Sequence, residues 1–106
     1  MKYKVVISNP AKTDIINAIR WYKEHVPFKV KALKTEINKT AQSLNKFPER
    51  FQTHYKKHRF APVLHFEYNL HYYIDNKQFK VLVTALFHEK EDPKNWGKKK
   101  SIPKTH

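Results

Sequence analysis

The sequence contains no cysteine and only one glycine, and its acidic residues are fewer than half as numerous as its basic ones. Without cysteine the chain can form neither a disulfide framework nor a thiolate metal site. The longest apolar runs are far shorter than the roughly 18 residues that a membrane-spanning helix requires, and the N-terminal residues do not resemble a signal peptide. We therefore expect a cytoplasmic protein that does not enter the membrane.

The seven histidines do not indicate a metal site. His54 and His58 have the i, i+4 spacing of two ligands on a helix. They fall, however, in a segment that favours a strand or a loop, where this spacing does not bring two side chains together. We expect neither a metal ion nor another cofactor.

Positive charge dominates the composition. The 106 residues include 22 Lys and Arg against 9 Asp and Glu, which gives a formal net charge of +13. Such a field attracts polyanions and acidic proteins and repels further copies of the chain. Only Arg20, Arg50 and Arg59 are arginines, so most of the charge is lysine, which attracts phosphate diffusely but clamps it poorly. The length fits a single domain.

Periodicity places one strand and two helices in the first half of the chain. Residues 3–8 alternate apolar and polar side chains, as a strand does, and Ser8 or Asn9 can then cap a helix that has Pro10 in its first turn. Residues 10–25 carry an apolar stripe at helical spacing, and so do residues from 27 or 28 to about 46. The short break at Val26-Pro27 predicts an antiparallel helix hairpin.

The second half reads as three strands. Residues 55–60 form a short, basic and weak strand that Pro62 would end. Residues 66–74 and 79–87 alternate strongly, and the turn-forming residues 75–78 between them predict a hairpin. The later residues are charged and rich in turn formers.

The order of elements is therefore β-α-α-β-β-β, and the expected fold class is α+β, with the helix hairpin packed on one face of a mainly antiparallel four-stranded sheet. We expect one domain over residues 1–96 and a basic, disordered tail over 97–106. The sheet face away from the helices would meet water or a partner. It would carry the less apolar residues of the two strong strands, namely Glu67, Asn69, His71, Tyr73, Lys80, Leu82, Thr84 and Leu86.

Several stretches, taken in this order, resemble the RelE/ParE toxins of type II toxin–antitoxin systems over residues 2–96. They comprise the opening strand followed by Pro10-Ala11, the pair Trp21-Tyr22, Leu44-Asn45-Lys46-Phe47-Pro48, the strand 66–75, and Ala85-Leu86-Phe87-His88 with Asp92-Pro93 and Trp96.

The resemblance implies the toxin of a plasmid-stabilisation type system that a cognate acidic antitoxin neutralises. The Asp-Pro-x-x-Trp stretch and the Trp-Tyr pair are more similar to ParE-like members, which bind DNA gyrase. The antitoxin would fold over the helix hairpin and the sheet edge, and we assign Trp21 and Tyr22 to its binding; the alternative role of both is packing in the core or at an interface. The alternative is a RelE-like endoribonuclease that cleaves mRNA on the ribosome, so the sequence leaves open whether the chain is an enzyme.

Cleavage of RNA without a metal needs a base, an acid and cations around one phosphate. Arg59, Lys57 and His88 are the catalytic candidates if the chain is a nuclease. The target-binding candidates are Lys56, His58, His71, Tyr73 and Glu89. We expect all of these candidates, catalytic and target-binding, on or beside the sheet face away from the helices. Two departures oppose cleavage: Asn69 stands where nuclease members carry arginine, and Glu67 stands where they carry proline.

The same residues could instead have purely structural roles. His88 can be a structural hydrogen-bonding residue, and His71 and Tyr73 can be solvated neighbours across strands. A third hypothesis is a non-toxic, basic nucleic-acid-binding module, which predicts strongly salt-dependent binding and harmless overexpression. The target and the oligomeric state stay undetermined at this level.

Overall fold

The computed structural model describes residues 2–90, so the predicted tail 97–106 and the Asp-Pro-x-x-Trp stretch lie outside the described residues. Helices and strands follow the order expected from the sequence, with one additional strand. The elements are β1 (Lys4–Ile7), α1 (Asn9–His25), α2 (Val30–Ser43), β2 (Thr53–Tyr55), β3 (His58–Val63), β4 (Tyr68–Asp75) and β5 (Lys80–His88), with 3-10 turns η1 (Pro27–Lys29) and η2 (Pro48–Arg50).

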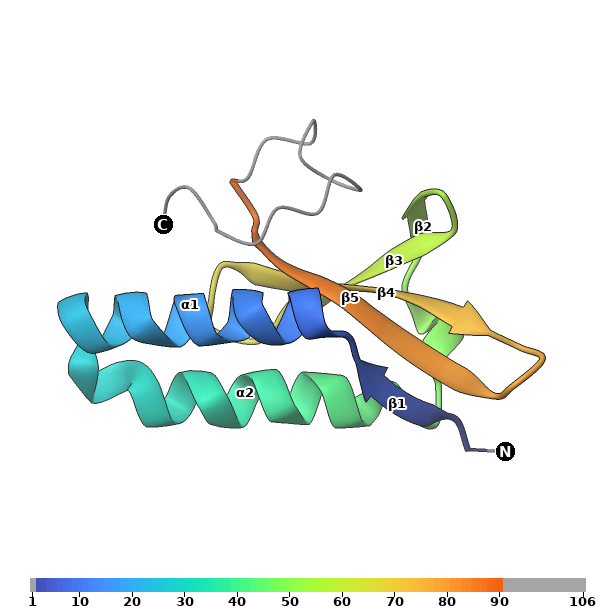
Figure 1. Cartoon of the computed structure of the whole chain (residues 1–106), viewed down its shortest axis with the longest axis horizontal. Coiled ribbons are helices and arrows are strands. Elements are labelled where there is room, and N and C mark those ends of the chain that lie inside the picture. Colours follow the sequence, from blue (N-terminus) through green and yellow to red (C-terminus); the bar gives the residue numbers. More distant parts are fainter. Residues whose placement is uncertain (1, 91–106) are drawn as a thin grey trace.

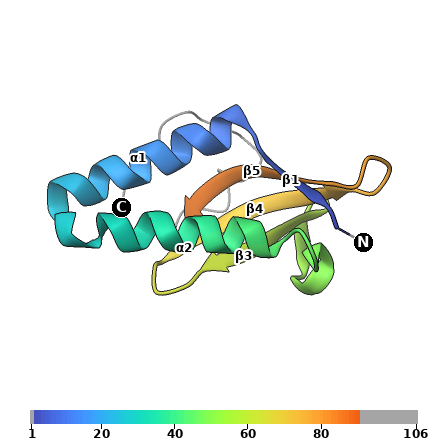
Figure 2. The same cartoon turned by 90° about the horizontal axis from the view of Figure 1, so that it is seen from below.

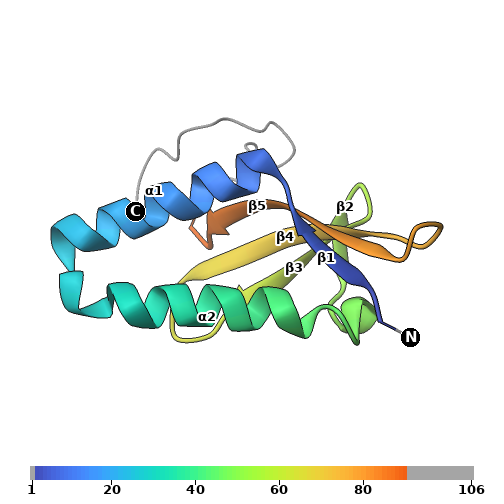
Figure 3. The same ribbon diagram turned by 60° about the horizontal axis from the view of Figure 1, so that its bottom comes forward.

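The two helices form one layer and the sheet forms the other (Figure 1). The sheet has the strand order β1-β5-β4-β3-β2, in which β1 is parallel to β5 and the remaining pairs are antiparallel. The helix connection lies at one end of the molecule, and the N-terminal strand and the β4–β5 hairpin lie at the other (Figure 3). The α+β class with a helix hairpin on one sheet face is confirmed, whereas the predicted number of four strands is wrong.

The fifth strand arises because the chain reverses inside the segment predicted as one strand. Lys56 and Lys57 form a two-residue turn, so Tyr55 ends β2 and pairs with His58 at the start of β3. Pro62 does not end the strand but lies within β3. It is tolerated because β2 pairs only with the first residues of β3, which leaves Pro62 on a free edge where no N–H is needed.

Local chemistry fixes the helix ends. The Ser8 hydroxyl accepts a hydrogen bond from the Ala11 backbone N–H at 3.2 Å, which confirms Ser8 as the cap of α1. Pro27 disfavours helical backbone at Val26, so α1 stops there and α2 begins after η1. The second helix was expected to end near residue 46, but it ends at Ser43. Leu44 and Asn45 donate to carbonyls three residues back and so form a turn instead of continuing the helix. Neither described helix is long and apolar enough to cross a membrane.

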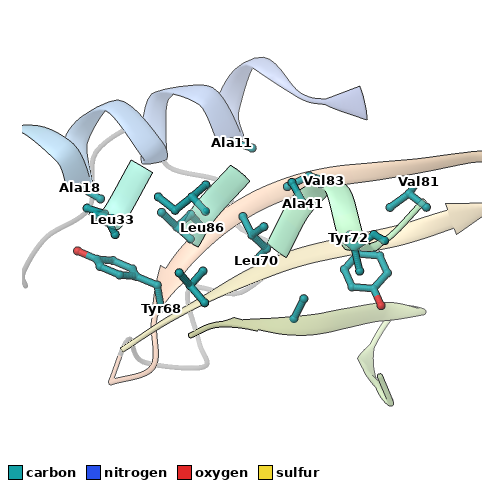
Figure 4. Close-up of a cluster of buried hydrophobic side chains, with 14 residues drawn as sticks. Ala11, Ala18, Leu33, Ala41, Tyr68, Leu70, Tyr72, Val81, Val83 and Leu86 are labelled. Carbon is teal, nitrogen blue, oxygen red and sulfur yellow. The ribbon is translucent and has the colours of Figure 1, made fainter. Parts of the chain in front are cut away.

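The core fills the space between the helix layer and the sheet (Figure 4). Small residues of α1, including Ala11 and Ala18, let the helix approach the sheet closely, while α2 contributes Leu33. Tyr68 and Tyr72 stand at the two ends of this cluster (Figure 4). α1 and α2 run side by side in opposite directions across this face (Figure 2).

A β-bulge in β5 changes which side chains face the helices. His71 pairs with Ala85 and Tyr72 pairs with Val83, so Thr84 is an extra residue on β5. Beyond Thr84 the alternation is shifted by one position. Leu86 therefore joins the core, although the sequence pattern placed it on the outer face.

Asp14 connects α1 to this part of β5. Its carboxylate is buried and accepts a hydrogen bond from the Leu86 backbone N–H at 3.0 Å. β1 pairs with β5 only as far as Val83, so the Leu86 N–H lies beyond the end of the neighbouring strand. Asp14 takes the place of a strand partner there.

Candidate functional site

Seven ring side chains gather on the sheet face opposite the helices, and we call them the ring cluster. Register places them there: Phe60 pairs with His71 on the face opposite Tyr72 and the core, and the bulge brings Phe87 to the same side. The cluster consists of His54, Tyr55, His58, Phe60, His71, Tyr73 and Phe87.

The rings of the cluster form a row across four strands. His54 of β2 stacks on Phe60 of β3 at 4.1 Å and 3°, and Phe60 stacks on His71 of β4 at 3.9 Å and 16°. Phe87 of β5 then lies 4.7 Å from His71 at a tilt of 56°. Rings that stack on one another use their flat faces internally and turn their edges outward. The row is therefore a poor platform for nucleic-acid bases, which need an open ring face.

His71 is the centre of the row and is almost completely buried, with 1% of its surface exposed. Its Nδ1 lies 3.3 Å from the Tyr55 hydroxyl, and its backbone carbonyl accepts a hydrogen bond from the Thr84 hydroxyl. A side chain held in this way cannot itself contact a target. The expected place of His71 on an accessible binding surface is therefore wrong.

One accessible part of this face, among residues 2–90, is its corner at the β2–β3 turn. We call it the β2–β3 corner, and it comprises His54, Lys56, Lys57, His58 and Tyr73. Tyr73 is 36% exposed and its ring lies 5.4 Å from the His58 ring, so a partly open aromatic residue stands beside two exposed lysines. The structure thus brings together three of the predicted target-binding residues, Lys56, His58 and Tyr73, and separates Glu89, which is exposed beyond the end of β5.

The two lysines occupy a turn that disfavours them. Lys56 and Lys57 have φ values of 42° and 66°, as the central residues of a type I′ hairpin turn do, where Asn-Gly is preferred. Each left-handed non-glycine residue costs roughly 1–2 kcal/mol. The turn keeps two positive charges at the corner at the expense of stability.

Replacing Lys57 with glycine is expected to raise the free energy of unfolding by about 1 kcal/mol, because glycine adopts positive φ without steric cost. Urea titration of the two proteins measures the difference. Lys77→Gly is the matched control, since Lys77 lies in the β4–β5 turn but does not have positive φ. A gain in both variants, or in neither, would show that the backbone at Lys57 is not strained.

The nuclease candidates do not converge. Arg59 pairs with Tyr72 and therefore lies on the helix side of the sheet, where its Nη1 donates to the carbonyls of Glu49 at 3.1 Å and Phe51 at 2.5 Å. It borders a shallow hollow on the flank of the sheet, and Lys57 stands apart on the turn.

His88 lies at the other end of the sheet. It pairs with Tyr68, four residues before the Tyr72 that pairs with Arg59, so the two positions are about 13 Å apart along the strands. The His88 Nδ1 accepts a hydrogen bond from the Lys90 N–H at 3.1 Å, and its Nε2 lies 3.4 Å from the Glu67 carboxylate. The expectation that Arg59 and His88 share the outer face is wrong, and the shift at Thr84 explains it for His88.

Both residues of the Trp-Tyr pair are half-buried, but their rings have different neighbours. The Trp21 ring stacks on His25 at 4.3 Å, whereas Tyr22 packs edge-on against Phe66 and joins the margin of the core. Tyr22 thus packs against the core, which is the structural role that the sequence left open for it. The assignment of both residues to antitoxin binding stays a prediction.

Three tyrosines near the core have perturbed acidity. Burial raises the pKa of Tyr72 to about 12, against a smaller lowering by Arg59 and Arg50, and its hydroxyl donates to the Pro48 carbonyl at 2.6 Å. Burial also raises the pKa of Tyr68 well above its usual range. The pKa of Tyr22 is raised by burial and, to a smaller extent, by the nearby Glu67 carboxylate. These phenols are poor acids, so they suit packing better than proton transfer. Within residues 2–90 no three side chains of His, Asp or Glu are placed to hold a metal ion.

Sequence reasoning missed His54, Tyr55, Phe60 and Phe87 as members of one cluster. Phe60 was missed because its segment was predicted as one weak strand, without the reversal at Lys56-Lys57 that sets its pairing with His71. Phe87 was missed because its side of the sheet depends on the bulge.

Comparison with known proteins gives a family and a fold. A family model described as the ParE toxin of the type II toxin–antitoxin system parDE matches residues 5–93, most of the chain. Comparison with curated protein sequences finds no match.

Two solved structures are similar to this chain. A chain of the chromosomal ParDE toxin–antitoxin system from P. aeruginosa superposes with a TM-score of 0.72 at 9% identity, covering 81% of this chain and 95% of that one. A chain of the toxin–antitoxin complex RelBE2 from Mycobacterium tuberculosis gives a TM-score of 0.59 at 19% identity, covering 83% and 99%. At these identities the likeness concerns the fold, and the family rests on the match over residues 5–93: the chain belongs to the ParE toxins of type II toxin–antitoxin systems.

Proposed function

We propose that this toxin acts in the cytoplasm by binding DNA gyrase and blocking it, and that it does not cleave RNA. One observation carries the choice between the two activities of the wider family. Cleavage needs a base and cations around a single phosphate, yet Arg59 and His88 lie about 13 Å apart along the strands. Both are also engaged by backbone groups of the chain itself.

Binding without chemistry makes different demands. A docking surface needs an aromatic or arginine anchor and charges that complement the partner. The β2–β3 corner supplies the partly exposed Tyr73 beside Lys56 and Lys57, which are both exposed and occupy a turn with positive φ. We propose this corner as the part of the described chain that contacts the target.

An acidic antitoxin completes the proposal. The two similar structures are described as a toxin–antitoxin system and a toxin–antitoxin complex. The formal charge of +13 favours a partner of opposite sign, and charge complementarity would also speed its capture. We expect the product of the adjacent gene to be acidic and to abolish toxicity when it is expressed together with this chain.

Induced expression in a bacterial host tests the activity directly. Growth should stop, and incorporation of labelled thymidine should fall before incorporation of labelled leucine, because gyrase serves replication. Purified protein should inhibit supercoiling of relaxed plasmid by gyrase, whereas mRNA on ribosomes should stay intact.

The alanine variants of Arg59 and His88 separate the alternatives. Both should still inhibit gyrase, since neither lies at the β2–β3 corner. Ribosome-dependent mRNA cleavage by the wild type that disappears in either variant would overturn the proposal in favour of a nuclease. Harmless expression together with unaffected supercoiling would overturn it in favour of a non-toxic binding module.

A further inference from the structure

Three partly exposed side chains form a line across the outer face of the sheet, and we call Val6, Leu82 and Tyr73 the cross-strand row. Register aligns them: Val6 of β1 pairs with Leu82 of β5, and Leu82 pairs with Tyr73 of β4. Their neighbours along the strands, such as Val5 and Val81, pack in or against the core, so alternation turns the row away from the helices. Tyr73 also belongs to the β2–β3 corner, which makes the row continuous with the proposed target contact.

A pair of lysines lies beside the row, toward the β4–β5 hairpin. Lys4 and Lys80 are direct partners on the parallel strands β1 and β5, so their side chains leave the same face of the sheet. Asp75 pairs with Lys80 from the other side. Its Oδ1, however, accepts the backbone N–H groups of Lys77 and Gln78, and neither Lys4 nor Lys80 forms an ion pair among residues 2–90. Like charges directly opposite each other on neighbouring strands are destabilising, so this pair costs the fold stability.

The cross-strand row therefore lies between two cationic positions. The Lys56-Lys57 turn precedes β3 on one side, and the lysine pair lies on β1 and β5 on the other. Because β3 and β1 are three strand spacings apart, these positions are separated by about 14 Å across the sheet. An apolar centre between charged margins is the arrangement found in protein–protein interfaces.

We propose that the target-binding surface extends from the β2–β3 corner along the cross-strand row to Lys4 and Lys80, and that it takes an acidic segment of gyrase; this inference rests on the proposed function. Apolar side chains of that segment would cover Val6 and Leu82, with Tyr73 as the aromatic anchor. Carboxylates on both sides of those apolar side chains would meet the lysine pair and the β2–β3 turn. The partner is thus a protein surface with an apolar centre and separated negative charges.

A nucleic acid fits this surface less well. Its phosphates would satisfy the lysines, as they do at most basic surfaces. They would leave Val6 and Leu82 without an apolar partner. Bases need open ring faces, and within the row Tyr73 alone carries a ring, which already contacts the ring of His58. The aliphatic part of the row therefore favours a protein.

Two variants with matched controls test the surface, and the readout is the concentration of toxin that halves supercoiling by gyrase. Lys4→Glu replaces the like-charge pair with an opposite-charge pair, and its control is Lys31→Glu, the same change at an exposed position of α2. Leu82→Lys puts a charge into the row while adding to the positive charge of the surface. Its control is Leu64→Lys, since Leu64 is 62% exposed in the turn between β3 and β4.

Lys4→Glu should inhibit gyrase at least tenfold less well than the wild type. Its melting temperature should nevertheless equal or exceed that of the wild type, because the variant relieves the repulsion with Lys80. A purely structural role of Lys4 cannot lower inhibition while leaving the fold as stable or more stable. Leu82→Lys should also lose at least tenfold, while both controls stay within about twofold of the wild type. If Leu82→Lys melts well below the wild type, Lys4→Glu decides the test.

Four other outcomes would overturn the proposal. If the wild type inhibits gyrase and Lys4→Glu inhibits it equally well, the surface does not extend beyond the corner, and the proposed function stands. If the wild type leaves gyrase unaffected, both proposals fall. Inhibition that Leu82→Lys retains or strengthens and Lys4→Glu loses would assign the surface to nucleic acid. Normal inhibition by both variants, with lost binding of the adjacent gene's product in calorimetric titration, would assign it to the antitoxin.

Discussion

Replacing Asp14 with alanine is expected to lower the free energy of unfolding by about 2 kcal/mol, as measured by urea titration. The carboxylate is the acceptor for the Leu86 N–H at 3.0 Å, in a place that no strand covers because β1 has already ended. Loss of an acceptor from a buried N–H costs roughly 1–3 kcal/mol. Part of this cost is offset because the buried carboxylate no longer has to be desolvated.

Asp14→Asn separates the acceptor from the charge. Asparagine has nearly the same shape and keeps one acceptor oxygen, so it should recover most of the stability that alanine loses. An alanine variant as stable as the wild type would show that Leu86 finds another partner. An asparagine variant as unstable as the alanine variant would show that the charge, rather than the hydrogen bond, matters.

The helices and the two strong strands could be predicted because their patterns are local. The stripe of α1 and its Ser8 cap are visible in the sequence, and the structure keeps both within a residue of the expected bounds. The alternation over β4 and most of β5 likewise reflects burial of one face of each strand. These features need no knowledge of what lies across the sheet.

Two features of the sheet could not be predicted because their energetic support is not local. No residue next to Thr84 in the sequence indicates a bulge. The position of the bulge follows from two hydrogen bonds between residues distant in sequence, one from the Ser8 N–H to the Val83 carbonyl and one from the Leu86 N–H to the Asp14 carboxylate. Lys56-Lys57 is a poor sequence for a type I′ turn, so the hairpin there is stabilised by packing around it. The ring of Tyr55, for example, stacks on His58 at 4.8 Å.

The predicted site residues were likewise placed correctly where their pattern is local, and wrongly where their side of the sheet depends on the bulge or on the reversal at Lys56-Lys57. His71 and Tyr73 were placed correctly on the outer face because they follow the regular alternation of β4, whereas the bulge lies on β5. His88 lies after the bulge and was placed on the wrong face. Arg59 was misplaced because the reversal at Lys56-Lys57 was not anticipated, and with it the register of β3 on β4.

Alkaline pH should destabilise the fold strongly through its buried tyrosines. Burial raises the pKa of Tyr72 to about 12, and it also raises that of Tyr68, whereas both titrate near 10 in an unfolded chain. A group whose pKa is raised by folding contributes stability that is complete below the unfolded pKa and is lost as the pH rises through the folded pKa. Between pH 10 and 12 Tyr72 alone therefore removes about 3 kcal/mol, at about 1.4 kcal/mol for each pH unit.

Tyr68 should add a loss of similar size, so a domain of ordinary stability would be close to unfolding at pH 12. Urea titrations at pH 9 and pH 11.5 measure this, and Tyr68→Phe isolates one contribution, since phenylalanine keeps the ring in the core and cannot ionise. This variant should lose about 2 kcal/mol less than the wild type over that interval. Tyr73→Phe removes a hydroxyl from a ring that is 36% exposed and should follow the wild type. Equal losses in all three proteins would mean that ionisation of the Tyr68 phenol does not contribute to alkaline unfolding.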